Sequence, residues 1–274
     1  MAPSTEAARV SIATFNVHMG VDGWGRPFDV VAECAELDAD LLVLQEAWTP
    51  NEGGPGTAAT IASKLGYRVV AEASLARGRL YEPVATTSRR WSPLFGQLRM
   101  FRPAHRLEGE RQGGRSGRGR RANVRGRWGI ALLARVPVHD PGVLDLGSLR
   151  RDAARRAVVR CTTVLGGRTV SVFGTHMSHI THFSPAQYRR LARLLPPDNT
   201  PAVLAGDMNM WGPPVNSFFP AWRRAVVGRT WPSWRPHSQL DHVLITPALS
   251  VVDARIAAAS GSDHRPVVVT LGLA

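Results

Sequence analysis

The sequence has 274 residues, of which 44% are hydrophobic and 20% are charged, and its formal net charge is +13. A chain of this length can bury a core without covalent staples, and its only two cysteines, Cys34 and Cys161, exclude a disulfide framework and a cysteine zinc site. The first residues lack a basic segment followed by an apolar run, and no stretch reaches the length of a membrane span. We therefore expect a cytoplasmic protein with no signal peptide and no integral membrane segment.

The positive charge is concentrated in one segment. Ten arginines and two glutamates lie between Arg99 and Arg127, among many glycines. Because such a segment has almost nothing to bury, we expect a flexible Arg/Gly-rich loop at about 102–127, with 108–126 as its mobile part. Two interpretations stay open, a loop that tracks a polyanion and a solvated loop whose arginines reflect codon usage, since Lys64 is the only lysine.

The hydrophobic pattern predicts many strands with a few interspersed helices. In chain order we expect strands at 10–17, 41–46, 67–71, 128–135, 155–165, 168–175, 201–205, 240–245, 251–256 and 266–271, and helices at 28–37, 57–65 and 184–195. Gly166 and Gly167 suit a two-residue hairpin turn, and Ser184 and Pro185 suit the cap and first position of the third helix. The pattern indicates an α+β layered sandwich over 10–274, preceded by a disordered segment 1–9.

Polar residues stand at the ends of these apolar strands in six places. They are Asn16, Glu46, His176, Asp207 with Asn209, Asp241, and Asp263 with His264. Any one of them alone is typical of a turn former or a strand-end cap. Six occurrences, all drawn from Asn, Asp, Glu and His, favour one common site, because loops at one end of a sheet converge and carry chemistry.

This set of side chains suits a hard, oxygen-ligated cation. Mg²⁺ is held by carboxylates, waters and phosphate oxygens, which leaves the imidazoles for proton transfer. A zinc enzyme is expected to show several histidines or cysteines as close ligands. His176, His179 and His182 lie close together but lack the HExxH spacing. We therefore expect Mg²⁺ or Mn²⁺ as the cofactor.

Six short motifs carry a family resemblance. They are TFNVH at 14–18, LQE at 44–46, GTH at 174–176, GDMN at 206–209, LDHVL at 240–244 and SDHRPV at 262–267. In this order the sequence resembles the endonuclease/exonuclease/phosphatase family of DNase I-like and exonuclease III-like metal-dependent phosphoesterases, over about residues 10–271. The resemblance implies a four-layered α/β/β/α sandwich with two packed, mostly antiparallel sheets.

The resemblance also implies roles for the acidic and amide residues. Glu46 is expected to be the principal Mg²⁺ ligand, with Asn16 and Asp263 close to the metal, directly or through water. Asp207 and Asn209 are expected to orient the attacking water or the phosphate, and Asp207 is a candidate base. These residues form the expected metal and phosphate side of the site.

The imidazoles have separate implied roles. His264 is expected to contact the scissile phosphate and to act in acid–base chemistry, oriented by Asp241, because a carboxylate behind an imidazole fixes its tautomer. His176 occupies a position that is histidine in DNase I-like and sphingomyelinase-like relatives. No carboxylate partner of His176 follows from the sequence, and Glu72 and Glu82 are only guesses.

The substrate is less well defined than the chemistry. The arginine-rich segment favours a Mg²⁺-dependent hydrolase of nucleic-acid phosphodiesters, acting as a monomer. A sphingomyelin-type or other phospholipid phosphodiesterase is the alternative that the GTH histidine permits. An inositol-phosphate phosphatase is a further alternative, and 232–244 matches the segment typical of that subgroup only loosely. A non-catalytic polyanion-binding module is disfavoured because every expected site position is filled. Trp231 and Trp234 either line a substrate groove or pack against the sheet.

Overall fold

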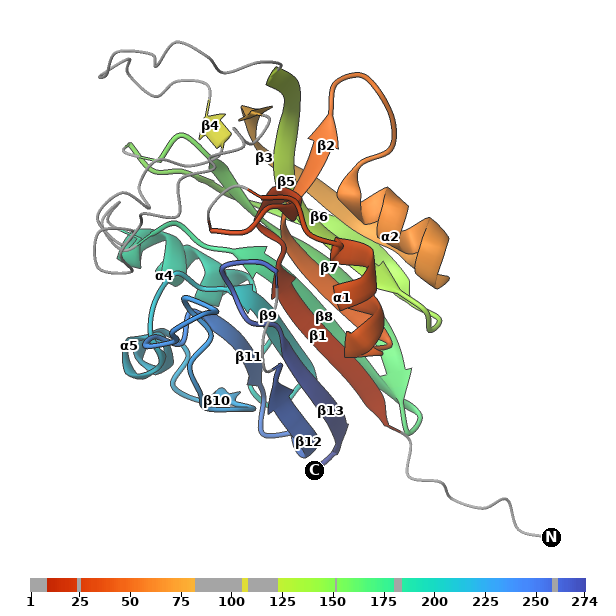
Figure 1. Ribbon diagram of the computed structural model, residues 1–274. Helices are drawn as coiled ribbons and strands as arrows, with labels where there is room; N and C mark the ends of the chain where they lie inside the picture. The colour runs from red at the N-terminus through yellow and green to blue at the C-terminus, as the bar shows by residue number, and fades with distance from the viewer. Residues whose placement is uncertain are drawn as a thin grey trace, which may run out of the picture.

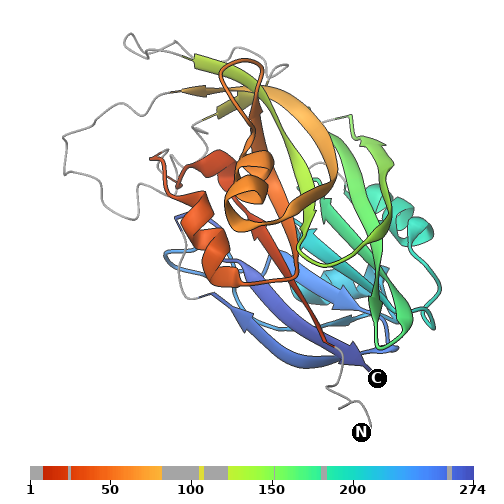
Figure 2. The same cartoon turned by 90° about the vertical axis from the view of Figure 1, so that its right-hand side faces the viewer.

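The computed structural model describes residues 9–23, 26–81, 105–107, 123–150, 152–179, 184–257 and 261–274. Within these residues two β-sheets pack face to face, and helices cover the outer face of each sheet (Figure 1, Figure 2). The expected four-layered α/β/β/α sandwich is confirmed.

Both sheets are mixed but mostly antiparallel. The seven-stranded sheet has the order β12 (Leu249–Ile256), β13 (Val267–Leu273), β1 (Val10–Asn16), β2 (Leu41–Pro50), β5 (Asn123–Ala134), β3 (Arg68–Tyr81), β4 (His105–Leu107). The six-stranded sheet has the order β10 (Arg223–Arg224), β11 (Asp241–Ile245), β9 (Ala202–Asp207), β8 (Arg168–His176), β7 (Arg155–Leu165), β6 (His139–Ser148). β1 pairs with β2 and β8 pairs with β9 in parallel, and the other neighbours are antiparallel.

The helices divide between the two outer layers. On the first sheet lie α1 (Val30–Leu37) and α2 (Thr57–Leu65), and on the second lie α4 (Pro185–Leu194) and α5 (Gly212–Phe218), while the short 3₁₀ helix η1 (His18–Gly20) follows β1. Among the described residues, no helix has the length and apolar character to cross a membrane.

The apolar run at the start of β2 shows why this sequence forms layers. Leu41 and Val43 point into the core between the sheets, and Leu42 and Leu44 point to the core beneath α1 and α2. All four side chains are at most 1% exposed. Because successive strand residues face opposite sides, a strand buried on both sides must be apolar at every position.

The strands on either side of the arginine-rich segment are longer than the sequence predicts. β3 continues to Tyr81 instead of ending at 71, and β5 begins at Asn123 instead of 128. Residues 105–107 and 123–127, expected as part of a loop, therefore belong to β4 and β5. The backbone ladder between β3 and β5 forms here although the side chains bury little, which hydrophobic periodicity does not detect. Residues 82–104 and 108–122, and the expected disordered segment 1–8, lie outside the described residues.

Several elements and one cap also differ from expectation. The hydrophobic pattern does not predict β6 or α5, because Pro141, Gly142 and Gly147 interrupt the β6 pattern and α5 begins with a glycine and two prolines. It also does not predict η1, β4 and β10, which have only two or three residues each and are too short to show a period. β6 lies at the edge of its sheet, where strands tolerate such residues. Ser184 is the N-cap of α4, but its hydroxyl makes no capping hydrogen bond.

Gly206 permits the close approach of the two parallel strands beside the polar strand ends. Its φ is +155°, and an added Cβ would overlap the carbonyl oxygen of Thr175 on β8. We expect Gly206→Ala to lower the free energy of unfolding by about 3 kcal/mol or more, because backbone strain adds to a steric clash with another backbone. Gly167→Ala is the matched control, since φ is +77° there but no atom lies within 4 Å of the new Cβ, and only about 1–2 kcal/mol should be lost. Urea unfolding of both variants measures the difference, and equal losses would contradict the predicted clash.

Candidate active site

The polar side chains predicted from the motifs gather at one edge of the sandwich, where the carboxyl ends of the two parallel strand pairs meet. The set comprises Asn16, Glu46, His176, Asp207, Asn209, Asp241, Asp263 and His264. Strand register places Asn16 beside Gln45 in the first sheet and His176 beside Asp207 in the second. Asn16 bridges the sheets, because its amide donates hydrogen bonds to Asp207 at 3.0 Å and to Glu46 at 3.3 Å.

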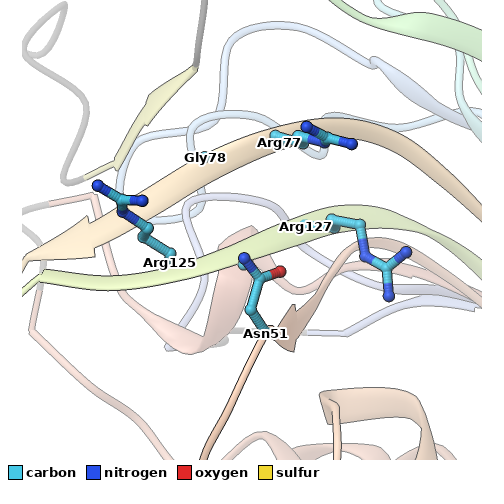
Figure 3. A pocket seen from close by; sticks show the side chains of 6 residues that line it. Asn51, Arg77, Gly78, Arg125 and Arg127 are labelled. Atoms are coloured by element: carbon cyan, nitrogen blue, oxygen red, sulfur yellow. The ribbon is translucent and has the colours of Figure 1, made fainter.

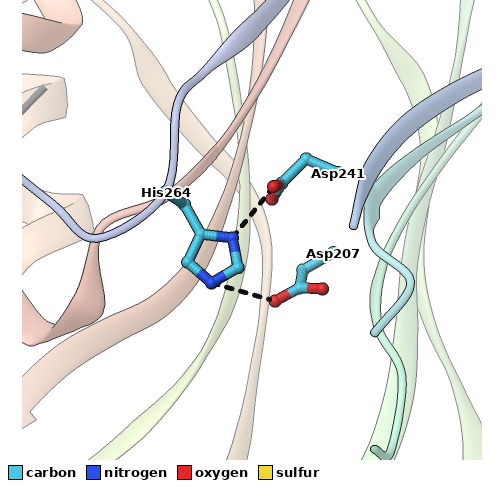
Figure 4. A group of neighbouring side chains, drawn as sticks. All are labelled: Asp207, Asp241 and His264. Atoms are coloured by element: carbon cyan, nitrogen blue, oxygen red, sulfur yellow. Dashed lines mark hydrogen bonds and ion pairs between the residues drawn. The ribbon is translucent and has the colours of Figure 1, made fainter. Parts of the chain in front are cut away.

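His264 lies between two buried carboxylates (Figure 4). Its Nδ1 is 2.9 Å from Asp241 Oδ2, and its Nε2 is 3.8 Å from Asp207 Oδ2. Burial by itself lowers the pKa of His264, but the negative charges of Asp241, Asp207 and Asp263 raise it well above its usual range. The imidazole is therefore held in its charged form with Nδ1–H donated to Asp241.

Asp207 occupies the centre of the site and is 1% exposed. Its Oδ1 accepts a hydrogen bond from the Asn209 backbone N–H at 2.7 Å, and its Oδ2 accepts one from the Asn16 amide. Burial raises the pKa of Asp207 to about 7 although His264 acts to lower it. A carboxylate whose pKa lies near neutrality is suited to accept a proton during a reaction.

His176 is buried beside Asp207, but its closest partner is an amide. Its Nε2 is 3.1 Å from Asn209 Nδ2 and 3.6 Å from Asp207 Oδ2. Because the Asn209 amide also donates to the Met177 carbonyl at 3.0 Å, its nitrogen faces both groups and the His176 Nε2 accepts a hydrogen bond. A neutral imidazole with its proton on Nδ1 fits this arrangement.

The surroundings of His176 keep it neutral. Burial is the largest cause, and the charges of Arg156 and His264 add to it, so the pKa of His176 lies well below its usual range. The Nδ1 atom is buried and has no hydrogen-bond partner among the described residues. Neither sequence guess for a carboxylate partner is supported, since Glu72 is exposed and contacts Thr49 instead, and Glu82 lies outside the described residues.

A buried ion pair behind His176 was not predicted from the sequence. Arg156 Nε donates to Asp152 at 2.8 Å, Arg156 Nη1 donates to the His176 carbonyl at 3.3 Å, and the Ser178 hydroxyl donates to Asp152. The Trp128 ring lies 5.5 Å from the His176 ring, between centroids. Burial raises the pKa of Asp152, but Arg156 and the Ser178 hydroxyl lower it below its usual value overall. In the sequence, Arg156 and Asp152 look like any surface arginine and aspartate, and only their burial in the structure distinguishes them.

Glu46 has the features of an anionic ligand held ready for a cation. It lies at a β-bulge between Gln45 and Ala47, with a φ of +54° that is rare for a residue other than glycine. One carboxylate oxygen accepts the Asn16 hydrogen bond, while the other, Oε2, is buried and has no hydrogen-bond partner among the described residues. A buried carboxylate oxygen without a donor is costly, and a divalent cation satisfies it.

Asp263 faces different partners from Glu46. Its Oδ1 is 3.6 Å from His18 Nδ1, and its Oδ2 accepts a hydrogen bond from the Trp231 indole N–H at 3.3 Å. Burial raises the pKa of Asp263, but His18, His264 and Trp231 together lower it below the usual value. His18 stands in the TFNVH motif but was not singled out. Trp231 therefore belongs to the site, while Trp234 is 36% exposed.

Three other side chains of the site also form a group of potential metal ligands. Ligand atoms of Asp207, Asp241 and His264 all lie within 4.8 Å of one another. Both ring nitrogens of His264 already face carboxylates, Nδ1 facing Asp241 at 2.9 Å and Nε2 facing Asp207 at 3.8 Å. This group is therefore better suited to proton transfer, and Glu46 with Asn16 is better suited to the metal.

Comparisons with known proteins agree with this geometry. The model of the Endonuclease/Exonuclease/phosphatase family matches residues 13–264. An endonuclease/exonuclease/phosphatase from Beutenbergia cavernae DSM 12333 is similar in structure, with a TM-score of 0.64, 20% identity, and coverage of 97% of this chain and 72% of that chain. None of the curated proteins matches the sequence.

Two further solved structures illustrate the range of similar proteins. D. rerio TDP2, complexed with single-strand DNA product, has a TM-score of 0.58 at 12% identity, covering 96% of this chain and 99% of that one. The Bacteroides thetaiotaomicron VPI-5482 mannosyl-6-phosphatase Bt3783 has a TM-score of 0.58 at 15% identity, also covering 96% and 99%. At these identities the likeness establishes the shared fold.

Proposed function

Because the chain belongs to the endonuclease/exonuclease/phosphatase family and is thereby a metal-dependent phosphoester hydrolase, we propose that it hydrolyses phosphodiester bonds of nucleic acid with Mg²⁺ or Mn²⁺. The observation that carries the chemistry is the buried cluster in which Glu46 Oε2 lacks a donor while Asp207 and His264 face each other. The net charge of +13 supports a polyanionic substrate, and a single-strand DNA product is present in one structural neighbour.

The proposed metal site is built on Glu46. Its free oxygen is the anionic ligand, Asn16 fixes the position of the carboxylate, and Asp263 is proposed to act through water. Bound there, a divalent cation would stabilise negative charge on the phosphate oxygens during attack. The oxygen-rich set favours a hard cation of the Mg²⁺ class.

Asp207 and His264 are proposed to move the protons. With a pKa near neutrality, Asp207 accepts the proton of the attacking water. Hydrogen bonds from the Asn209 N–H and the Asn16 amide hold the Asp207 carboxylate in place. The charge of His264, which Asp241 orients, stabilises the phosphate oxygens. As the water oxygen bonds to phosphorus and the bond from phosphorus to the leaving oxygen breaks, His264 gives its proton to that leaving oxygen. Neutral His176 and Asn209 are proposed to position the phosphate.

A substrate panel tests this function. We expect the wild-type protein with Mg²⁺ or Mn²⁺ to cleave single-stranded DNA, duplex DNA or RNA, and to lose this activity in EDTA. Sphingomyelin, inositol phosphates and mannose 6-phosphate represent the alternative substrates, the last because one structural neighbour is a mannosyl-6-phosphatase. Cleavage of one of these with nucleic acid untouched would overturn the proposed substrate. Polyanion binding without any hydrolysis would favour a non-catalytic module.

The expectation of a cytoplasmic monomer stays a prediction. We propose that the chain acts alone, because a single copy folds so that the predicted metal ligands and proton-transfer groups already lie together. Light scattering of the purified protein measures its mass and tests the monomer directly.

A further inference from the structure

Two neighbouring strands extend beyond the active-site edge and present arginines on one face. Residues 77–80 of β3 and 124–127 of β5, here called the β3–β5 arm, pair in antiparallel register. Arg77 stands opposite Arg127, Gly78 opposite Gly126, and Arg79 opposite Arg125. Since side chains two residues apart share a face of a strand, the four arginines lie on the same face of the arm.

This arrangement has an electrostatic cost that the described part of the chain does not offset. Like charges directly opposite one another in an antiparallel pair are destabilising. Other arginines of the protein have acidic partners, such as Arg135 with Asp38 and Arg155 with Asp145. Among the described residues, none of the four arm arginines forms an ion pair. An anion bound on this face would remove the repulsion.

Three of the four arm arginines line a pocket. Its volume is about 390 Å³, and its lining consists of Asn51, Arg77, Gly78, Arg125, Gly126 and Arg127 (Figure 3). Gly78 and Gly126 alternate with the arginines along the two strands and line the pocket with backbone atoms. Arg77, Arg125 and Arg127 are exposed, so their guanidinium groups are accessible to a ligand. Guanidinium groups bind phosphate oxygens through paired hydrogen bonds.

The pocket is connected to the active site by continuous strands. From Glu46 the chain continues along β2 to Pro50, and Asn51 follows, so Asn51 lies five positions after the proposed metal ligand. At the spacing of a β-strand this corresponds to roughly 17 Å. On β5, Arg127 immediately precedes Trp128, whose ring contacts that of His176, and alternation along the strand turns the arginine face of the arm away from that contact. A mononucleotide or sugar phosphate held at Glu46 would not reach the arm, whereas a polymer that continues past the edge of the sheet would.

We propose that Asn51, Arg77, Arg125 and Arg127 form a phosphate-binding subsite that holds the backbone of a polymeric nucleic acid at a distance from the bond being cleaved. The identity of the polymer rests on the proposed function. The subsite adds affinity and favours long substrates over short ones, and it takes no part in the chemical step.

The test compares two variants with the same loss of charge. The arm variant replaces Arg77, Arg125 and Arg127 by glutamine. The control variant makes the same replacement at Arg160, Arg168 and Arg189, which are exposed on the second sheet and α4. Binding of a fluorescein-labelled single-stranded DNA of about 20 nucleotides is measured by anisotropy in EDTA over a range of salt concentrations.

We expect the arm variant to bind the DNA at least tenfold more weakly at low salt. Its slope of log K against log salt should fall by about 2, since each phosphate contact to a single strand contributes about 0.7. An arm variant with lysine at the three positions keeps the charge and should retain most of the slope. Turnover of bis(p-nitrophenyl) phosphate with Mg²⁺ or Mn²⁺ should change less than twofold, because this small diester does not span the two sites.

The remaining outcomes separate this proposal from the proposed function. Equal weakening in the control variant, or an unchanged slope in the arm variant, overturns the subsite. If wild-type protein binds the DNA through the arm but never cleaves nucleic acid, the subsite stands and the proposed substrate is wrong.

Discussion

Replacing Glu46 by alanine should abolish divalent-metal-dependent hydrolysis, with a loss in kcat of about 10³-fold or more. Glu46 Oε2 is the buried carboxylate oxygen that lacks a hydrogen-bond donor among the described residues. A metal at a phosphoryl group supplies several kcal/mol of charge stabilisation, and each 1.4 kcal/mol corresponds to a factor of ten in rate. Initial rates over a titration with MgCl₂ and MnCl₂ measure the loss.

The same variant should behave differently in the absence of metal. The wild-type protein keeps one buried, unsatisfied oxygen of Glu46, and alanine removes it while leaving the backbone conformation unchanged. We therefore expect the melting temperature in EDTA to be equal or higher in Glu46→Ala than in the wild type. Addition of Mg²⁺ should raise the melting temperature of the wild type but not that of the variant, because ligand binding to the folded state stabilises it.

Glu72→Ala is the matched control for this prediction. Glu72 is an exposed glutamate on β3 whose carboxylate accepts a hydrogen bond only from the Thr49 hydroxyl among the described residues. Its replacement should leave the rate and the metal-dependent stabilisation within twofold and about one degree of the wild type. Full metal-dependent turnover in Glu46→Ala would show that the metal is held elsewhere, and the Asp207–Asp241–His264 group would then be the place to look.

Replacing His264 by alanine should lower kcat/KM by about 10³-fold. His264 is the one imidazole of the site that the surrounding carboxylates hold in its charged form, and general acid–base catalysis contributes 10²–10⁴-fold. His139→Ala is the control, because His139 is an exposed histidine at the start of β6. Circular dichroism of both variants shows whether the fold is retained.

The pH dependence of the reaction tests the partner of His264. A histidine that must be protonated is active below its pKa, and its contribution is lost as the pH rises through that value. Asp241 is the foremost of the charges that raise the pKa of His264, so Asp241→Asn should lower this pKa and move the alkaline limb of kcat/KM to lower pH by about one unit or more. An alkaline limb at the same pH in the wild type and in Asp241→Asn would refute the role of His264 as the acid.

On the acid side of the pH profile, activity is expected to fall as the pH decreases. Asp207 accepts a proton only when ionised, so its contribution is present above its pKa and lost below it. Because burial raises this pKa to about 7, activity should already fall as the pH drops through neutrality, before an ordinary carboxylate with a pKa near 4 would protonate.

The sequence by itself predicted the layered fold and eight polar side chains that the structure brings together at one edge. The buried strands are local patterns, since a run such as LLVL in β2 has no polar face to expose, and the polar residues at the ends of such runs follow from the same pattern. The ordered motifs then predicted one site from residues far apart in the chain. Asn16 and Asp207, 191 residues apart, are joined by a hydrogen bond as that prediction requires.

Tertiary structure alone decided the partners of these residues. His176 faces Asn209 and a buried Arg156–Asp152 pair instead of a carboxylate of its own, and Asp263 faces His18. Such contacts depend on strand register and on the packing of one sheet against the other, and hydrophobic periodicity contains neither. Nothing in the sequence indicated that Arg77 and Arg127 stand opposite each other, because cross-strand neighbours are set by pairing between distant segments.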